Sequence, residues 1–264
     1  MEKYDFGLIG LGVMGRNFIL NIAENGHSAL GYDLDEDKVK ALEKEASEFR
    51  VKGVNTLNEF IEGLSRPRKV MMLVPAGVVD NVLDDVLPLL DKDDLVIDGG
   101  NSHPDDTDRR TSMVVEKGFR YIGVGISGGA EGARHGPSMM PGGEGSAYKE
   151  VKDIFEGAAA KVDGSPCVTW LGPGSAGHFV KMVHNGIEYG IMQLTSEVYD
   201  MMKNGLHMEN PEMKSIFETW NNGPLSSFLV EITADILGKE DQVEGGYLID
   251  HILDSAKQKG TGKW

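Results

Sequence analysis

The chain has 264 residues, of which 40% are hydrophobic, so it is long enough for one large domain or two modest ones with a packed core. Its 26 basic and 42 acidic side chains give a net charge of −16, which argues against nucleic acid and anionic membranes as partners. Cys167 is the single cysteine, and neither a signal peptide nor an 18-residue apolar run is visible, so we expect a cytoplasmic protein.

The first predicted elements form a nucleotide-binding unit. Residues 6–9 are typical of a buried parallel strand, a helical pattern ends near residue 26, and a second strand at 28–32 leads to Asp33. The loop between the first strand and the helix is Gly10-Leu11-Gly12-Val13-Met14-Gly15. In this position it matches the fingerprint of dinucleotide-binding folds, in which the first glycine allows a tight turn, the second lets a pyrophosphate approach and the third permits close packing. The alternative is a loop whose glycines serve only a turn.

Asp33 bears on the choice of cofactor. At the end of the second strand its carboxylate can accept hydrogen bonds from the adenosine ribose. The additional 2′-phosphate of NADP would lie close to Asp33, Asp35 and Glu36, and like charges at such distances cost about 1–4 kcal/mol. The nearest candidate cation, Lys38, is several residues further on. The sequence therefore favours NAD over NADP, unless Asp33 merely caps a turn.

The alternation of strands and helices continues through the first half. Apolar strands are predicted within 68–77, 93–102 and 119–129, with crossover helices at 78–90 and 106–117. Ligands of open parallel sheets bind beyond the carboxyl ends of the strands. These ends place Val74, Pro75, Ala76, Asn101, Ser127, Gly128 and Gly129 beside the glycine loop. We expect an α/β, Rossmann-like doubly wound parallel sheet over 1–174, followed by an all-helical domain over 175–264.

The first helix of the second half carries an unusual polar stripe. Lys181, His184, Asn185, Glu188 and Tyr189 are spaced i, i+3, i+4, i+7 and i+8, so they share one helix face. Val180, Val183, Ile187 and Ile191 lie on other faces and are predicted to hold the helix in a core. Oxidation of an alcohol needs a base, and burial favours the neutral amine of a lysine, which can accept a proton. The alternative is an ordinary solvated face.

The chain resembles the decarboxylating 6-phosphogluconate dehydrogenases. The resemblance spans the whole sequence and is carried by GLIGLGVMGRN, DGGNS, ISGGAEGARHGPSMMPGG, GHFVKMVHNGIEYG and KQKGTGKW. It implies oxidation of 6-phosphogluconate at C3 with Lys181 as general base, loss of CO₂ from the β-keto acid, and protonation of C1 by Glu188 to give ribulose 5-phosphate. No metal is implied, because the 3-keto group accepts the electrons. The implied substrate-binding residues are Asn101, Ser127, Gly128, Gly129, His184, Asn185, Tyr189, Lys259 and Thr261.

Three features depart from the family pattern. Where the family carries an arginine for the 2′-phosphate of NADP, its default cofactor, this chain has Asp33-Leu34-Asp35, and Pro75 replaces a lysine. Family members also continue beyond Trp264, and we expect this chain to be a C-terminally truncated piece of an enzyme that is a homodimer at full length. The alternatives are a catalytically incomplete nucleotide-binding fragment and a related β-hydroxyacid dehydrogenase.

Overall fold

The computed structural model describes residues 3–253, 255 and 264. The chain divides into two compact units, Met1–Val183 and His184–Trp264, and the division falls inside the long helix α8 (Ala176–Asp200). This helix begins within one residue of the predicted position. The two units are described separately below.

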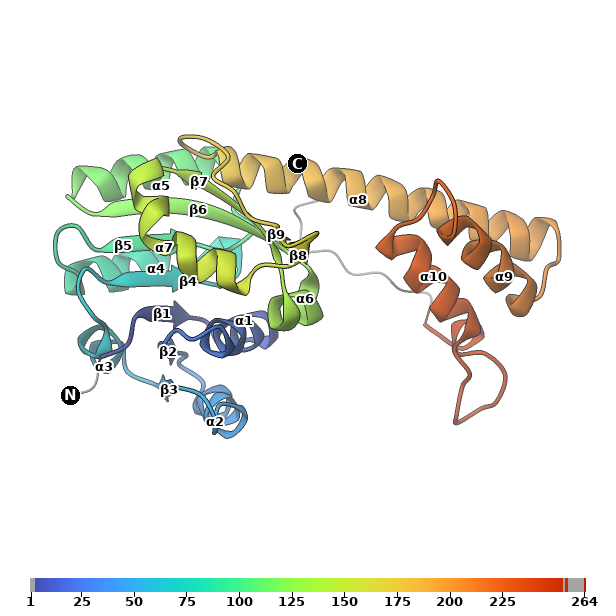
Figure 1. Cartoon of the computed structure of the whole chain (residues 1–264), viewed down its shortest axis with the longest axis horizontal. Helices are drawn as coiled ribbons and strands as arrows, with labels where there is room; N and C mark the ends of the chain where they lie inside the picture. Colours follow the sequence, from blue (N-terminus) through green and yellow to red (C-terminus); the bar gives the residue numbers. More distant parts are fainter. Residues whose placement is uncertain (1–2, 254, 256–263) are drawn as a thin grey trace. The chain divides into compact units, whose positions relative to one another are not determined.

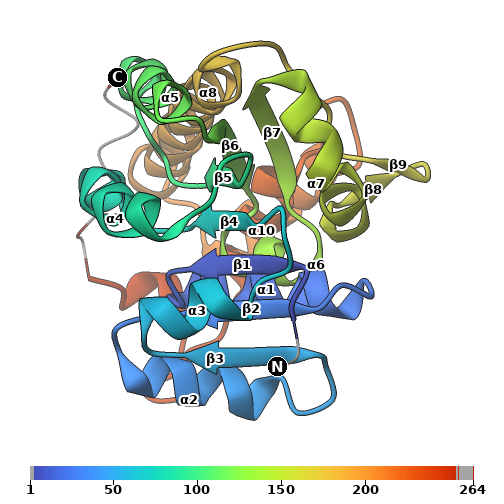
Figure 2. The same ribbon diagram turned by 90° about the vertical axis from the view of Figure 1, so that its left-hand side faces the viewer.

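The first unit is built on a seven-stranded sheet in the order β3-β2-β1-β4-β5-β6-β7 (Figure 2). The strands are β1 (Phe6–Ile9), β2 (Ala29–Tyr32), β3 (Val51–Val54), β4 (Lys69–Met72), β5 (Leu95–Asp98), β6 (Arg120–Ser127) and β7 (Ser138–Gly143). The first six are parallel, whereas β7 pairs antiparallel with β6 at the edge. A short hairpin joins β8 (Lys161–Val162) to β9 (Ser165–Pro166). The predicted Rossmann-like sheet is confirmed, with two edge strands that were not predicted, the parallel β3 and the antiparallel β7.

Helices cover both faces of this sheet because successive residues of the buried strands are apolar on both sides. Leu8 and Met71 belong to one core cluster, while their neighbours Ile9 and Met72 belong to the cluster on the opposite face. The first face is covered by α1 (Val13–Glu24), α2 (Glu36–Glu45), α6 (Gly129–His135) and α7 (Gly145–Ala158) (Figure 2). The second is covered by α3 (Leu57–Gly63), α4 (Val79–Val86) and α5 (Pro104–Glu116), with the short helices η1 (Ala76–Val78) and η2 (Leu87–Leu89) flanking α4.

The second unit is helical, as predicted. It contains the later part of α8, a π-helical turn η3 (Met201–Gly205), α9 (Asn210–Asn221), α10 (Phe228–Gly238) and the short η4 (Leu248–Asp250) (Figure 1). Among its described residues the only β pairing is an isolated bridge between Glu240 and Tyr247. A small core forms where α10 packs on α9, from Met202, Met213, Phe217, Ala234 and Leu237.

One expectation about α8 is wrong. Val180, Val183, Ile187 and Ile191 are 38%, 44%, 59% and 41% exposed instead of buried. Helical spacing predicts which side chains share a face, but that face is buried only if another element packs against it. No element in the described part of the chain buries these four side chains. No helix among the described residues has the length and apolar character needed to span a membrane.

Candidate functional site

The glycine loop after β1 has the shape that a dinucleotide requires. Gly10 adopts φ of +100°, a conformation that favours glycine, and a Cβ there would lie 2.7 Å from the Leu73 carbonyl oxygen. A Cβ on Gly15 would overlap the Gly10 carbonyl, which fixes α1 close to β1. A Cβ on Gly12 would meet no atom within 4 Å among the described residues. The loop is therefore closed by Gly10 and Gly15 and open at Gly12, where a diphosphate can approach the amino end of α1.

The amino end of α1 suits an anion. Among the described residues no side chain caps this end, and the first turn of the helix contains no acidic residue. Its backbone N–H groups and its helix dipole therefore give the loop a local positive potential within a strongly acidic protein.

Asp33 holds the glycine loop in place. Its Oδ2 accepts a hydrogen bond of 2.8 Å from the Leu11 N–H, and its Oδ1 accepts one of 3.0 Å from the Asp35 N–H. Lys38, five positions along the chain, returns to Asp33 with its Nζ 3.3 Å from both carboxylate oxygens. The α2 helix thus brings a cation onto Asp33 that sequence separation had appeared to keep away, so the negative charge facing a ribose is partly neutralised.

A pocket of about 340 Å³ opens beside Asp33. It joins the ends of β1 and β2 to one face of α4, and it contains three of the predicted cofactor residues, Gly10, Asp33 and Val74. Its other lining residues were not predicted: Ile9, Tyr32, Leu34, Leu57, Val78, Asn81, Val82, Asp85 and Val86. The spacing of four between Val78, Val82 and Val86 predicts one aliphatic face of α4, but it does not predict whether that face lines a pocket or packs in the core. A mostly aliphatic pocket with a few polar groups is typical of a small-molecule site.

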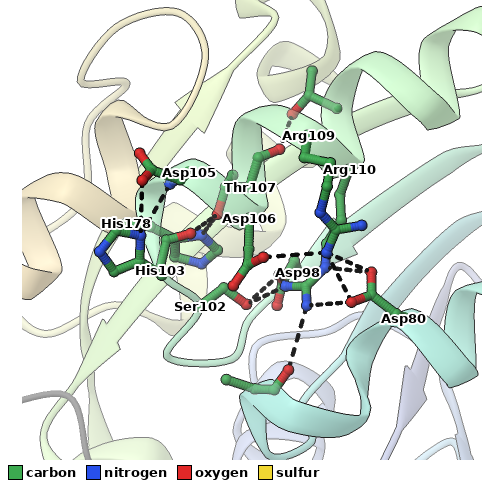
Figure 3. Close-up of polar contacts among 12 residues, drawn as sticks. Asp80, Asp98, Ser102, His103, Asp105, Asp106, Thr107, Arg109, Arg110 and His178 are labelled. Carbon is green, nitrogen blue, oxygen red and sulfur yellow. Dashed lines mark hydrogen bonds and ion pairs between the residues drawn. The ribbon is translucent and has the colours of Figure 1, made fainter.

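The loops after β4 and β5 lie against each other. A Cβ on Gly100 would be 3.0 Å from the Val74 carbonyl oxygen, so these backbones approach closely. Asn101 lies in the second loop, and the buried Asp98 accepts hydrogen bonds on both sides of it, from the Gly100 N–H (3.0 Å) and from Ser102 Oγ (2.6 Å). Figure 3 shows this carboxylate within a network of polar side chains. Pro75 and Ala76 follow Val74 and lead into η1 and α4.

The loop after β6 contains the next predicted residues. Ser127 ends the strand, and the next two residues, with φ of +128° and +60°, are Gly128 at the N-cap of α6 and Gly129 as its first residue. A Cβ on Gly128 would lie 2.8 Å from the Gly132 Cα, whereas Gly129 faces open space among the described residues. Because β6 neighbours β5, the Ser127 and Asn101 loops leave the same edge of the sheet.

Lys181 is buried where the first turns of α8 meet β6 and β7. It is 6% exposed, and a Cβ on Gly125 of β6 would overlap the Lys181 side chain. A Cβ on Gly177 would likewise overlap the Met140 carbonyl, and one on Gly142 would overlap the Gly177 amide. Glycines on all three elements therefore allow the helix to lie directly on the sheet, and this contact fixes the position of the lysine backbone.

One turn before the lysine, His178 is another buried polar residue that sequence reasoning missed. It is 1% exposed, and its Nδ1 lies 2.6 Å from Thr107 Oγ1 of α5 (Figure 3). Burial lowers the pKa of His178, which favours the neutral imidazole. His178 lies three positions before Lys181 in the sequence, and this helical spacing could have predicted that the two side chains share a face.

The rest of the polar stripe lies in the second unit. His184 Nδ1 is 3.2 Å from Glu188 Oε2 and 3.4 Å from Asn185 Oδ1, so these three side chains are in contact. Asn185 is buried, whereas Glu188 and Tyr189 are partly exposed. Lys259 and Thr261 lie outside the described residues. No group of three or more His, Cys, Asp or Glu side chains in the described part of the chain is arranged to bind a metal.

Comparison with known proteins accounts for both halves. Residues 5–172 match the family model of the NAD binding domain of 6-phosphogluconate dehydrogenase, and 177–264 match that of its C-terminal domain. The chain is 53% identical over 262 residues to 6-phosphogluconate dehydrogenase, decarboxylating 1, of Saccharomyces cerevisiae, covering 98% of this chain and 53% of that protein. The NADP(+)-dependent, decarboxylating enzyme of Bacillus subtilis is 49% identical over 265 residues, which is 100% of this chain and 56% of that protein. The chain thus spans about half the length of the curated relatives it matches.

Solved structures agree with these matches. The 6-phosphogluconate dehydrogenase of Plasmodium falciparum, described in its apo form and in complex with NADP+ and with 6-phosphogluconate, is 48% identical with a TM-score of 0.93. That match covers 98% of this chain and 56% of the Plasmodium chain. A 3-hydroxyisobutyrate dehydrogenase of Mycobacterium tuberculosis shares the fold, with a TM-score of 0.70 at 20% identity over 88% of this chain and 75% of its own. The parallel sheet and the helical half thus match those of a solved 6-phosphogluconate dehydrogenase, and the chain belongs to the 6-phosphogluconate dehydrogenase family.

Proposed function

We propose that this chain takes part in the NAD(P)-dependent oxidative decarboxylation of 6-phosphogluconate to ribulose 5-phosphate and CO₂. The observation that carries the proposal is the burial of Lys181 on a helix seated against the sheet that also holds the dinucleotide loop. The family match and the 6-phosphogluconate named for the Plasmodium structure support this sugar acid as the substrate. A phosphorylated sugar acid suits this site better than a small unphosphorylated acid, because the matched family takes that substrate.

The dinucleotide is held by the glycine loop and by the pocket beside Asp33. The backbone N–H groups at the amino end of α1 receive the diphosphate, and Asp33, Leu34 and Val74 contact the adenosine end. When bound, the nicotinamide accepts a hydride from the carbon that carries the substrate hydroxyl. The open space at Gly12 is the structural feature that fits this cofactor.

The side chains of α8 handle the protons. Lys181 takes the proton of the C3 hydroxyl while the carbon is oxidised to a ketone. The bond between the carboxylate carbon and its neighbour then breaks, CO₂ leaves, and the bonding electron pair moves into the ketone to give an enolate. Glu188, which lies against His184, returns a proton to C1 of the product. Asn101, Ser127, Gly128, Gly129, Asn185 and Tyr189 orient the sugar acid in this scheme, together with Lys259 and Thr261.

Within the proposal, NAD is the preferred cofactor. A 2′-phosphate would lie near Asp33 and Asp35, whose side chains are 12% and 51% exposed, and Lys38 offsets only part of that negative charge. NADP is the competing cofactor, because the names of the Bacillus and Plasmodium relatives both include it. The kcat/KM values with NAD and NADP at saturating 6-phosphogluconate decide between them, and a higher value with NADP overturns the preference.

The function is tested by the initial rate of dinucleotide reduction and CO₂ release with 6-phosphogluconate. Lys181→Met should abolish turnover while leaving dinucleotide binding in place, because Lys181 acts on the substrate proton. Lys152→Met is the matched control, since Lys152 pairs with Glu156 on the exposed face of α7. Turnover in Lys181→Met equal to that of the control would remove Lys181 from the mechanism. Dinucleotide binding with no turnover in the parent chain would instead support the alternative of a nucleotide-binding module.

The cellular setting is part of the same proposal. A cytoplasmic location is consistent with the single cysteine, and the family resemblance implies a homodimer for the full-length enzyme. Sedimentation equilibrium of a version extended to the length of the relatives tests the second point.

A further inference from the structure

Arg110 is a buried cation that touches several parts of the dinucleotide half. The side chain lies on α5 and is 3% exposed. Its Nε and Nη2 donate to the two carboxylate oxygens of Asp80 on α4, at 2.9 and 3.1 Å. Its Nη1 donates to Ser102 Oγ at 2.9 Å, and its Nη2 also reaches the Ala76 carbonyl at 3.4 Å (Figure 3). One guanidinium therefore contacts the segment after β4 and the loop after β5.

Asp98 extends these contacts to both sides of Asn101. Its Oδ2 lies 3.5 Å from Arg110 Nη1 and accepts hydrogen bonds from Ser102 Oγ (2.6 Å) and from the Tyr121 hydroxyl (3.0 Å). Its Oδ1 accepts from the Gly100 N–H. Ser102 thus receives from Arg110 and donates to Asp98, which joins the cation and the buried anion through one hydroxyl.

The charges in this cluster complement one another. Arg110 and its neighbour Arg109 hold the pKa of Asp80 well below its usual range, so Asp80 stays ionised. Burial, together with Asp98, raises the pKa of Tyr121, so its hydroxyl stays a donor. A lysine could carry the charge of Arg110 but could not repeat its planar fork of donors.

We propose that Arg110 is a positioning residue of the dinucleotide site, which ties the Ala76 segment to the Asn101 loop through Ser102. This inference rests on the proposed function, because it assumes that the two loops receive the dinucleotide. Both loops leave neighbouring parallel strands and then diverge into α4 and α5, so their relative position depends on groups that bridge them. The Arg110 side chain bridges the two loops through hydrogen bonds, while Gly100 and Val74 meet by backbone contact.

The test is the dissociation constant of NAD and of NADP, measured by calorimetry on the whole chain. Arg110→Lys should raise the constant about tenfold, and Ser102→Ala should raise it about three- to fivefold, because each removes one or two hydrogen bonds that fix the loops. Arg110 and Ser102 belong to the same chain of hydrogen bonds, so their effects should not add. The double variant should bind no more than about twofold more weakly than Arg110→Lys alone. Independent losses of stability would not produce that pattern.

Two controls separate positioning from general stability. Arg68→Lys disturbs another buried Arg–Asp cluster at the opposite end of β4, where Arg68 Nη1 lies 2.7 Å from Asp91 and Asp94. It should lower the free energy of unfolding and leave the dissociation constant unchanged, since a variant that stays folded binds like the parent unless its site has changed. Arg109→Met removes the second arginine that binds Asp80. Arg109 contacts neither loop, so this variant should bind NAD and NADP as the parent does.

The outcomes are distinct. Dissociation constants within about twofold of the parent for both Arg110→Lys and Ser102→Ala would overturn the positioning role, and so would an equal weakening in Arg68→Lys. Should Arg110→Lys fail to fold, Ser102→Ala decides alone, because it leaves the ion pair with Asp80 intact. A parent chain that binds neither dinucleotide would overturn the proposed function itself, and the inference with it.

Discussion

The contrast between Gly12 and Gly15 gives the sharpest prediction for the dinucleotide loop. Gly12→Ala adds a Cβ that meets no described atom within 4 Å, on a backbone with φ of −61° and ψ of 179° that alanine adopts freely. The folded state should therefore lose nothing, and a smaller entropy of the unfolded chain should raise the free energy of unfolding by about 0.4–1 kcal/mol. Gly15→Ala overlaps the Gly10 carbonyl, so the backbone must move, at a cost of about 1–3 kcal/mol.

Binding should follow a different order. The methyl of Gly12→Ala would occupy the space where the diphosphate approaches the amide groups of α1, and a hydrogen bond to a charged group contributes about 1.5–3 kcal/mol. Loss of one such bond corresponds to an increase of about 10- to 150-fold in the dissociation constant.

Urea denaturation and calorimetric titration with NAD and NADP measure the two quantities on the same samples. Gly12→Ala should unfold at the same or a higher urea concentration than the parent and bind far more weakly. Gly15→Ala should be impaired in both. Unchanged affinity in Gly12→Ala would show that the dinucleotide does not approach this position, and a large loss of its stability would contradict the open space at the loop.

Three further predictions concern other parts of the site. Gly125→Ala should push Lys181 off the sheet and lower kcat/KM about 100-fold, whereas Gly157→Ala on α7 should not, and equal rates in both would refute the packing argument. Burial lowers the pKa of His178 below its unfolded value of about 6.5, so the unfolded chain binds more protons; stability falls as pH drops below about 7, and His178→Gln should flatten urea midpoints between pH 7.5 and 5.5. Asp33→Asn keeps an acceptor for the loop but removes the charge, so it should raise the NADP-to-NAD ratio of kcat/KM about tenfold, and an unchanged ratio would exclude electrostatic discrimination there.

Much of the first unit could be predicted from sequence because its signals are local. A short apolar run such as 6–9, followed at once by a glycine turn, is typical of a strand buried on both faces, and the glycine spacing indicates the loop that follows. The antiparallel β7 was missed because Pro141 and two glycines are poor strand formers, although the edge of a sheet tolerates a proline.

The rest of the site depends on contacts between distant segments. The approach of Thr107 to His178 follows from helix packing that has no local signature, and even the return of Lys38 to Asp33, over only five positions, depends on where α2 begins. The aliphatic face of α4 has the same spacing as any crossover helix, so sequence alone does not distinguish a pocket wall from a core surface. The exposed side chains of Ile187 and Ile191 show the same limit of sequence reasoning, because the spacing predicts which residues share a helix face but not which element packs against that face.

The glycines beneath α8 also restrict how the proposed site around Lys181 can vary. Gly125, Gly142 and Gly177 interlock backbone with backbone, so the helix can neither slide nor roll by one residue without a collision. The amine of Lys181 therefore moves only by rotation of its own side chain. A change in what Lys181 reaches would therefore have to arise in its own side chain or in the loop that follows β6, because the contact between helix and sheet holds the lysine backbone in one position.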